Sequence, residues 1–355
     1  MGRHHPSHTL DANFIRFLTI YVLSLYRTSV YATGDTYVFD DRAIADILGV
    51  QDYEGLIRKV CRRAVQSPKA TYLLMERYTH INGFAGSSVA LLAGNIGYSR
   101  ELFSDQSVQP EGSSDRGMMI APKVLAATLD EHSDHVLGHA SHRTLAQVCL
   151  NAIAAYARLS VAERSILDRK PPCLLALVEQ FKDTYRGTAG NAPSLVRALG
   201  YHLASEYLAD REYQIKDEEI WFRYPDEKFR KTVKRGRKTD GTWFGHWTWV
   251  TVHGHFGTAE GDQGHGVEHD HYLSAVEALK AAAKFRPREL TNDEMFSLAV
   301  EGMRAFKDQW TAFYTIVLDE IEANTRECHS CFLPSSAASP WISDQQNPDQ
   351  CSALR

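Results

Sequence analysis

LVRALGYHLASEYLADREY, residues 195–213, is the stretch that decides the fold. Its apolar residues recur at helical spacing, which predicts a long helix buried along one side. Glu206 lies inside this otherwise apolar helix, and Asp210 shares its face one turn later. Burying a carboxylate is costly unless another group pairs with it. We therefore expect a functional or structural partner for Glu206 from another segment.

Helical periodicity continues on both sides of this stretch. No run of residues alternates in the manner of β-strands, no segment repeats, and no glycine-rich phosphate loop follows a strand. These features predict an all-α protein and argue against nucleotide binding through the common loops. The other expected helices span residues 14–25, 42–48, 72–92, 122–134, 142–159, 174–185, 242–253, 271–285 and 295–322.

The composition is that of an ordinary globular protein. Of the 355 residues, 44% are hydrophobic and 23% are charged, which allows a core with a polar cavity inside it. The net charge of -5 at pH 7 argues against nucleic-acid binding and favours a small-molecule substrate. The apolar run from Phe17 to Tyr26 is too short to span a bilayer, so we expect no membrane association. That helix could serve a homodimer as easily as a core.

Cysteine usage and the spread of apolar residues indicate the compartment and the domains. Six cysteines are scattered without the spacing of a disulfide framework, and no secretory signal precedes them. We therefore expect reduced thiols and a cytoplasmic protein. We also expect one metal-binding helical domain at residues 61–325, after an arm with accessory helices at 1–60 and before a mostly disordered tail at 326–355.

Acidic residues and histidines recur together on separate predicted helices. Glu76 and His80 are one helical turn apart, so both lie on one face. Glu131 and His142 are eleven residues apart. That spacing is close to three turns of a single helix, or else it places the two residues at helix ends that meet. Each pair taken alone would be interpreted as a solvated ion pair, whereas together they indicate a site.

The densest group of such residues is HGHFGTAEGDQGHGVEHDH, residues 253–271. His265, Glu268 and His271 follow one another at intervals of three and could share one stripe, and His253 ends the segment before them. A polar loop without function is the alternative interpretation. We favour function because the run leads directly into an apolar helix.

Carboxylates and imidazoles together indicate an iron site that activates dioxygen. Helical bundles build such sites from Glu and Glu-x-x-His groups that face inward from neighbouring helices. A structural zinc site would instead use paired thiolates, and only Cys328 and Cys331, in the predicted tail, have that spacing. The sequence therefore predicts a non-haem iron centre.

The order of these segments resembles that of the haem-oxygenase-like dimetal oxidases, which have thiaminase-like and quinone-cofactor-synthesis relatives. The resemblance covers residues 70–325 and implies a haem-oxygenase-like helical bundle. The matching stretches are ERYTHINGFAGSSVALLAGNIG (76–97), DEHSDHVLGHASHRTL (130–145), ALGYHLASEYLADREY (198–213), VTVH (250–253) with VEHDHYLSAVEAL (267–279), and EGMRAFKDQWTAFYTIVLDEI (301–321).

The resemblance also implies a set of metal ligands. They are Glu76 or His80 from the first core helix, Glu131 and His142 from the second, and His253, Glu268 and His271 from the third. The family commonly places histidine, carboxylate and histidine in one continuous helical stripe, whereas here a glycine-rich insert separates His253 from Glu268. Either the insert bulges out, or His265 replaces His253. We take Glu206 and His265 as the candidates for a catalytic role.

The function that the resemblance implies is an O2-dependent oxidase or oxygenase with two Fe(II) ions as its cofactor. Family substrates include free amino acids and fatty acids, in N-oxygenation, desaturation, cyclisation and carbon–carbon cleavage. We favour a free amino acid, in specialised metabolism, because the candidate pocket helices carry many polar residues, and a fatty acid would need a longer apolar tunnel. The residues themselves leave open one ion or two, and iron or manganese.

Two other functions are compatible with the sequence. One is a metal-independent hydrolase or transferase of the thiaminase-like branch, for which Cys149, near His142, would be the nucleophile. The other is a non-catalytic binding protein that uses the basic run EKFRKTVKRGRK, residues 227–238, on an acidic partner. A solvated loop is the simpler interpretation of that run.

Overall fold

The computed structural model describes residues 41–105, 115–133, 140–235, 245–254, 256–257, 263–264 and 267–330. The chain divides into two units, Met1–Val38 and Phe39–Arg355, and all of the described residues belong to the second. Their regular secondary structure is helical apart from one antiparallel pair of two-residue strands, β1 and β2. The prediction of an all-α architecture is confirmed for them. The helix expected at residues 14–25 lies outside the described residues.

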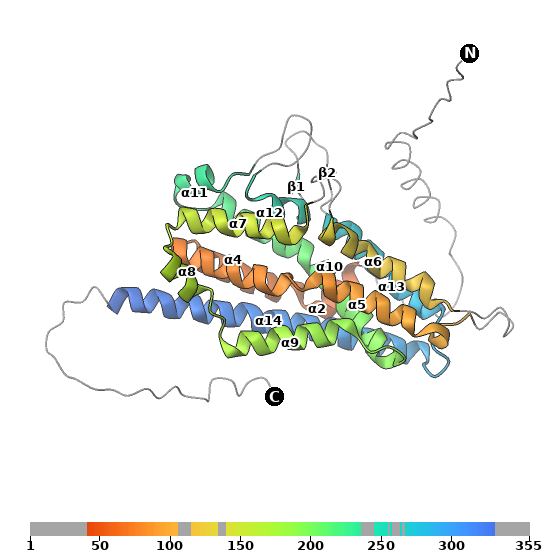
Figure 1. Ribbon diagram of the computed structural model, residues 1–355. Coiled ribbons are helices and arrows are strands. Elements are labelled where there is room, and N and C mark those ends of the chain that lie inside the picture. Colours follow the sequence, from red (N-terminus) through yellow and green to blue (C-terminus); the bar gives the residue numbers. More distant parts are fainter. Residues whose placement is uncertain are drawn as a thin grey trace, which may run out of the picture. The chain divides into compact units, whose positions relative to one another are not determined.

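The elements follow one another as labelled in Figure 1. They are α2 (Asp41–Leu48), α3 (Val50–Ala64), α4 (Pro68–Asn82), α5 (Ala85–Tyr98), η2 (Arg100–Leu102), α6 (Gly117–His132), α7 (His142–Tyr156), α8 (Val161–Leu167), α9 (Pro172–Arg186), α10 (Ala192–Lys216), η3 (Asp217–Phe222), α11 (Glu227–Thr232), α12 (Thr248–His253), β1 (Phe256–Gly257), β2 (Gln263–Gly264), α13 (Val267–Lys284) and α14 (Asn292–Ser330).

Helix α10, which contains the stretch quoted first, packs against α14, α13, α3, α9 and α12. Two glycines allow its close approach to α14. A Cβ atom at Gly200 would lie 2.0 Å from the carbonyl oxygen of Ala299, and one at Gly302 would lie 1.9 Å from that of Arg197. No side chain fits at either position, so these glycines set the distance between the two helices.

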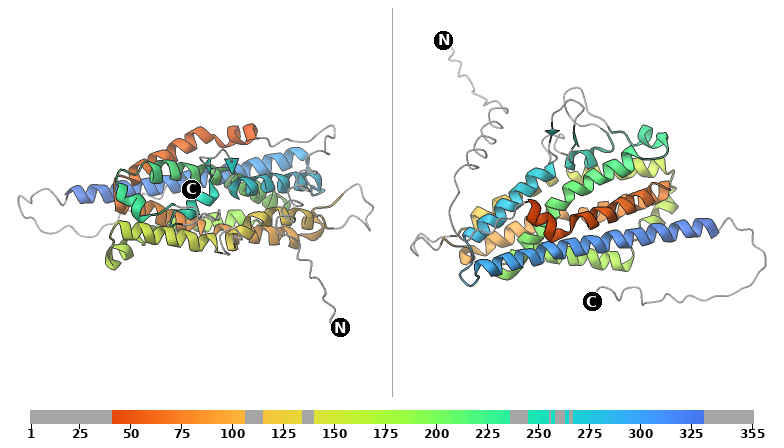
Figure 2. Two further views of the ribbon diagram at one scale, coloured as in Figure 1. Left: turned by 90° about the horizontal axis from the view of Figure 1, so that it is seen from above. Right: turned by 180° about the vertical axis from the view of Figure 1, so that it is seen from behind.

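The remaining helices complete the bundle around α10. Seen from behind, α2 and α3 lie between α10 and α14 (Figure 2), and α3 packs on both. On another side, α13 packs against α10 and α6, while α12 contacts α10, α7 and α13. Helix α12 thus connects α7 to α10, and α13 connects α6 to α10. No helix among the described residues is long and apolar enough to cross a bilayer.

Several helix boundaries differ from those expected. The helix expected over residues 72–92 is two helices, because α4 ends at Asn82 and α5 starts at Ala85. Gly83 lies at the break, and residues on both sides of it line a cavity, so the bend makes room there. Helix α6 starts at Gly117 rather than near Pro122, which lies inside it. Part of the basic run forms the short helix α11 instead of a loop.

The C-terminal end of α10 has a feature that periodicity did not predict. Its last residue, Lys216, leads directly into η3, a stretch of π-helix. One turn of π-helix inserts an extra residue into a helix and is often found near functional sites. Here it lies one turn beyond the part of α10 that carries buried carboxylates.

Candidate metal centre

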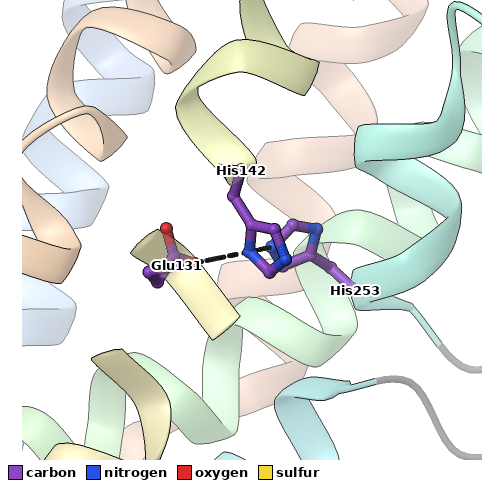
Figure 3. Close-up of side chains that lie close together, drawn as sticks. All are labelled: Glu131, His142 and His253. Carbon is purple, nitrogen blue, oxygen red and sulfur yellow. Dashed lines mark hydrogen bonds and ion pairs between the residues drawn. The ribbon is translucent and has the colours of Figure 1, made fainter. Parts of the chain in front are cut away.

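Three helix ends bring the first group of ligating side chains together. Glu131 lies in the last turn of α6, His142 is the first residue of α7, and His253 is the last residue of α12. The Nδ1 atom of His142 lies 3.0 Å from Oε1 of Glu131 and 2.9 Å from Nε2 of His253 (Figure 3). The same Nε2 atom lies 3.6 Å from Glu131 Oε1. Glu131 and His142 thus meet at two helix ends, the second of the two geometries that their spacing allowed.

The backbone and an aromatic ring orient His253. Its Nδ1 atom lies 2.5 Å from the carbonyl oxygen of Trp249, one turn earlier in α12. A proton on Nδ1 donated to this carbonyl leaves Nε2 with a free lone pair directed at Glu131 and His142. The ring of Tyr213 stacks on the imidazole, with centroids 4.2 Å apart. His253 is fully buried, as expected for a ligand rather than a surface histidine.

The second group comes from α10 and the start of α13. His271 Nδ1 lies 3.6 Å from Oε2 of Glu206 and 3.5 Å from Oε2 of Glu268. Glu268 and His271 are three residues apart in α13, so both side chains point to the same side. All three residues are buried. This group answers the expectation that Glu206 has a partner on another segment.

A hydrogen-bonding network holds Glu206 in place. The Tyr185 hydroxyl lies 3.2 Å from Oε1 of Glu206, 2.8 Å from Nδ1 of His202 and 2.7 Å from the hydroxyl of Ser205. His202 Nδ1 is itself 3.2 Å from the same carboxylate oxygen. The Oε1 atom is thus occupied by protein donors, while Oε2 faces His271. Such outer hydrogen bonds are typical of carboxylates that ligate metals.

Glu268 connects the two groups. Its Oε1 atom lies 3.7 Å from Nε2 of His253, in the first group, and its Oε2 atom lies 3.5 Å from Nδ1 of His271, in the second. One oxygen of a single carboxylate therefore faces each group. If each group held a cation, Glu268 would be within reach of both.

Burial and neighbouring charges shift the three carboxyl groups in different directions. Burial acts to raise the pKa of Glu131, but the imidazoles of His142 and His253 hold that pKa below its usual range. For Glu206, hydrogen bonds from His202 and His271 likewise outweigh burial and lower the pKa. Burial raises the pKa of Glu268 well above its usual range, and the charge of Glu206 adds to this effect. The ionised form is thus favoured for Glu131 and Glu206, and the protonated form for Glu268.

The two groups fit a pair of metal ions. In each group the three donor atoms all lie within 4.8 Å of one another. Neighbouring ligands at about 2.1 Å from an octahedral ion are about 3 Å apart, close to the spacing of the first group. The six donors are three carboxylates and three imidazoles, with no thiolate among them. The two clusters could therefore each hold one ion, with Glu268 between them.

A cavity of about 200 Å³ gives access to both groups. Glu131 and His142 of the first group line it, as do Glu206, Glu268 and His271 of the second. The rest of the wall combines polar side chains with aromatic rings. These residues include Thr79, Asn82, Ser87, His132, Ser141, Arg143, Ser205, Tyr78, Phe181, Tyr185, Tyr213, Trp249, Phe306 and Trp310.

Two of the candidate ligands do not join either group. Glu76 is buried and forms ion pairs with Arg77 and Lys170, which occupy its carboxylate. Arg77 also binds Glu320 at 2.8 Å, so Glu76 belongs to a network that ties α4 to α14. His80 lies against the ring of Phe84. Burial, followed by the charge of Lys170, lowers its pKa to about 4.

Other candidates fall outside what the structure describes. His265 is not among the described residues, so its choice as an alternative to His253 is not decided by its own position. The side chain of Cys328 and all of Cys331 are likewise outside the description. His253 itself joins the first group.

One buried network was not anticipated from the sequence. Lys216 is fully buried, 2.9 Å from the hydroxyl of Tyr314 and 3.3 Å from Oε2 of Glu212. Glu212 also accepts hydrogen bonds from Tyr53 and Tyr314, and it lines the cavity. The one-turn spacing of Glu212 and Lys216 was the only signal in the sequence. Tyr53 and Tyr314, which complete the network, come from distant helices.

No family model matches the chain, and no curated protein matches it.

Proposed function

We propose that the chain is a non-haem di-iron protein of the haem-oxygenase-like dimetal oxidase type, which uses O2 to oxidise a small substrate. One observation carries this proposal. Glu268 directs one carboxylate oxygen to each of two buried groups, and together these groups offer three carboxylates and three imidazoles. The donors come from α6, α7, α10, α12 and α13, so the site is a product of the bundle as a whole.

The donor set favours iron or manganese over structural zinc, and we propose iron. Mixed carboxylate and imidazole ligands suit iron or manganese, whereas structural zinc sites favour thiolates. Glu268, His269, Asp270 and His271 form a Glu-x-x-His sequence on α13. In helical bundles with di-iron sites, such a motif supplies two ligands from one helix, and a facing helix adds a Glu. Glu206 on α10 is in the position of that added residue.

The chain's own residues have defined parts in the proposed activity. Two ferrous ions, when bound, supply the electrons and the open coordination positions that O2 chemistry requires. The carbonyl of Trp249 holds the proton on Nδ1 of His253, and the Tyr185 hydroxyl holds Glu206 in one orientation. Tyr213 covers His253 and keeps water from that side. We therefore assign Glu206 as a metal ligand, whereas the sequence had suggested a catalytic role for it.

The cavity supports a small substrate. Its volume of about 200 Å³ is below the usual range for pockets that hold drug-sized ligands. Its wall mixes polar groups such as Asn82 and Ser87 with aromatic rings. A free amino acid fits this combination, whereas a fatty acid would require a longer and more uniformly apolar channel. We therefore retain a free amino acid as the proposed substrate class.

Iron binding and O2 consumption test the proposal together. The full chain is loaded anaerobically with Fe(II), freed of excess metal, and examined for iron by elemental analysis. We expect two ions per chain, and one ion in Glu131→Ala or Glu206→Ala, because each variant removes a ligand from one group only. Glu76→Ala is the control and should retain both ions. O2 is then added with a panel of free amino acids. A chain that binds no iron, or that consumes no O2 with any of them, would refute the proposal.

The observations give less support to the two other functions. Cys149 is fully buried, burial raises the pKa of its thiol, and it is not among the residues that line the cavity. In the basic run, Arg235 pairs with Asp217 and Arg230 donates to backbone carbonyls of the preceding turn. These cations stabilise the local fold, which leaves fewer of them for an acidic partner.

A further inference from the structure

We propose that Arg143 anchors the carboxylate of the substrate, and that the substrate is a small amino acid with an apolar body. This inference rests on the proposed function, because it concerns the same cavity. Arg143 is the only lysine or arginine among the described residues that line this cavity. No carboxylate in the described part of the chain forms an ion pair with it. Its guanidinium therefore has donors available for a ligand.

The position of Arg143 relative to the ligand groups is set by the covalent chain. It directly follows His142 in the first turn of α7, so their Cα atoms are about 3.8 Å apart. An arginine side chain extends several ångström further than that. A carboxylate held by Arg143 would thus lie close to the first ligand group without replacing His142. The remainder of a small molecule would then extend past both groups.

The exposure of the lining residues distinguishes the two ends of the cavity. Arg143, Ser87 and His132 are exposed, so this side forms the opening. Phe306 and Trp310 are buried and stack with centroids 4.6 Å apart, forming the closed end. The second ligand group lies near this end. Tyr185 contacts both Glu206 and the ring of Phe181, and Phe181 in turn contacts Trp310. The cavity therefore has a cationic opening and an aromatic floor.

A polar group near Arg143 also lacks a partner. The Thr79 hydroxyl is buried, lines the cavity, and has no hydrogen-bond partner among the described residues. Thr79 belongs to the last turn of α4. Gly83 shows that Arg143 lies beside this turn, because a Cβ atom placed on Gly83 would be 3.2 Å from the Thr79 carbonyl oxygen and 3.8 Å from Arg143 Nε. Buried hydroxyls without a partner are uncommon. A ligand's polar end would satisfy this one together with the guanidinium.

If Arg143 had a purely structural role, its removal would affect stability and ligand binding differently. A cation beside the last carbonyls of α4 stabilises that helix end. In that case, removing Arg143 would lower the melting temperature and would weaken every ligand alike. An anchoring arginine instead distinguishes a carboxylate from its neutral amide, because the amide cannot form a charge-assisted, two-point contact.

Calorimetric titration with two matched probes tests the inference. L-phenylalanine and L-phenylalaninamide are titrated into the full chain, both as purified and after loading with Mn(II). We expect the wild type to prefer the acid by about 10-fold or more, since hydrogen bonds between charged groups contribute that much. Arg143→Gln should weaken binding of the acid by about 10- to 100-fold and leave the amide unchanged. Arg186→Gln, on the exposed end of α9, is the control and should bind as the wild type does.

Three results would overturn the inference. They are equal binding of the acid and the amide by the wild type, no binding of either probe, and equal weakening of both probes in Arg143→Gln. The metal content of each sample is measured alongside. Absence of bound metal would count against the proposed function alone. The inference about Arg143 is tested separately, by whether the titrations show a preference for the acid and its loss in Arg143→Gln.

Discussion

Replacing Glu268 with glutamine is expected to stabilise the metal-free protein and to destabilise the metal-loaded one. The carboxylates of Glu206 and Glu268 are both buried, with facing oxygens no more than 4.8 Å apart. At that distance or less, two ionised carboxylates repel each other by about 3.5 kcal/mol or more, with an effective dielectric constant of about 20. Burial and the charge of Glu206 raise the pKa of Glu268, which relieves part of this repulsion. The gain from Glu268→Gln in the metal-free protein is therefore smaller than the full repulsion, about 1–3 kcal/mol.

The metal-loaded protein should respond in the opposite direction. Each ion present at 100 times its dissociation constant stabilises the fold by about 2.7 kcal/mol, so two ions contribute about 5 kcal/mol. Glu268 faces both groups, and its amide would be a poor ligand to either ion. If both affinities fall about 100-fold, the contribution of the two ions falls to about 1 kcal/mol. One substitution thus changes stability with opposite signs in the two states.

The assay is urea unfolding followed by circular dichroism, with and without Mn(II), which avoids reaction with O2. Glu212→Gln is the matched control, because Glu212 lines the same cavity and is equally buried. It pairs with Lys216 and belongs to neither ligand group. Its loss leaves a buried ammonium without its carboxylate, so the control should lose about 3 kcal/mol in both states.

The reasoning is refuted if Glu268→Gln behaves like the control. A loss of stability without metal, together with an unchanged gain from Mn(II), would mean that Glu268 is a structural hydrogen-bonding residue. Such a result would leave the fold as described and remove the link between the two groups.

Three further perturbations test other parts of the structure. Burial raises the pKa of Asp217 to about 6. The contribution of this residue to the free energy of unfolding is therefore largest below pH 4 and is lost as the pH rises through 6. In urea unfolding, the wild type should lose about 3 kcal/mol relative to Asp217→Asn between pH 4 and pH 7. Gly200→Ala forces a Cβ atom to within 2.0 Å of the Ala299 carbonyl and should cost about 3 kcal/mol, whereas Gly94→Ala, which meets nothing within 4 Å, should gain about 0.5 kcal/mol in the same measurement. Cys149→Ala should keep its iron and its O2 uptake, because Cys149 is buried and does not line the cavity; loss of both would mean that the site depends on this thiol.

Most helices could be predicted from the sequence because helical periodicity is a local property. The helices expected at 174–185 and 295–322 lie within α9 and α14, and the stretch at 195–213 lies within α10. The break at Gly83 was missed because glycine is tolerated inside a helix, and only the cavity beside α4 favours the bend. The π-helix η3 was missed because its residues continue the helical pattern of α10.

For the candidate ligands too, the sequence predicts the local pattern of residues but not which of them meet in the fold. Glu131, His142, Glu268 and His271 were predicted as ligands because acid and imidazole pairs at helical spacing share a face, and they lie in the two groups. Glu76 and His80 have the same local pattern, yet Glu76 is paired with Arg77 and Lys170. Nothing in the spacing distinguishes a metal ligand from a buried ion pair. The difference lies in which helix packs opposite.

By itself, the sequence determined that this chain is helical and that it carries carboxylates and imidazoles on several helix faces. Only the tertiary structure decided which of them converge, because His253 and Glu131 are 122 positions apart and meet where α12 packs against α7 and α7 against α6. Side-chain periodicity is set by contacts within a turn. The position of one helix end relative to another is set by the core that the whole chain builds.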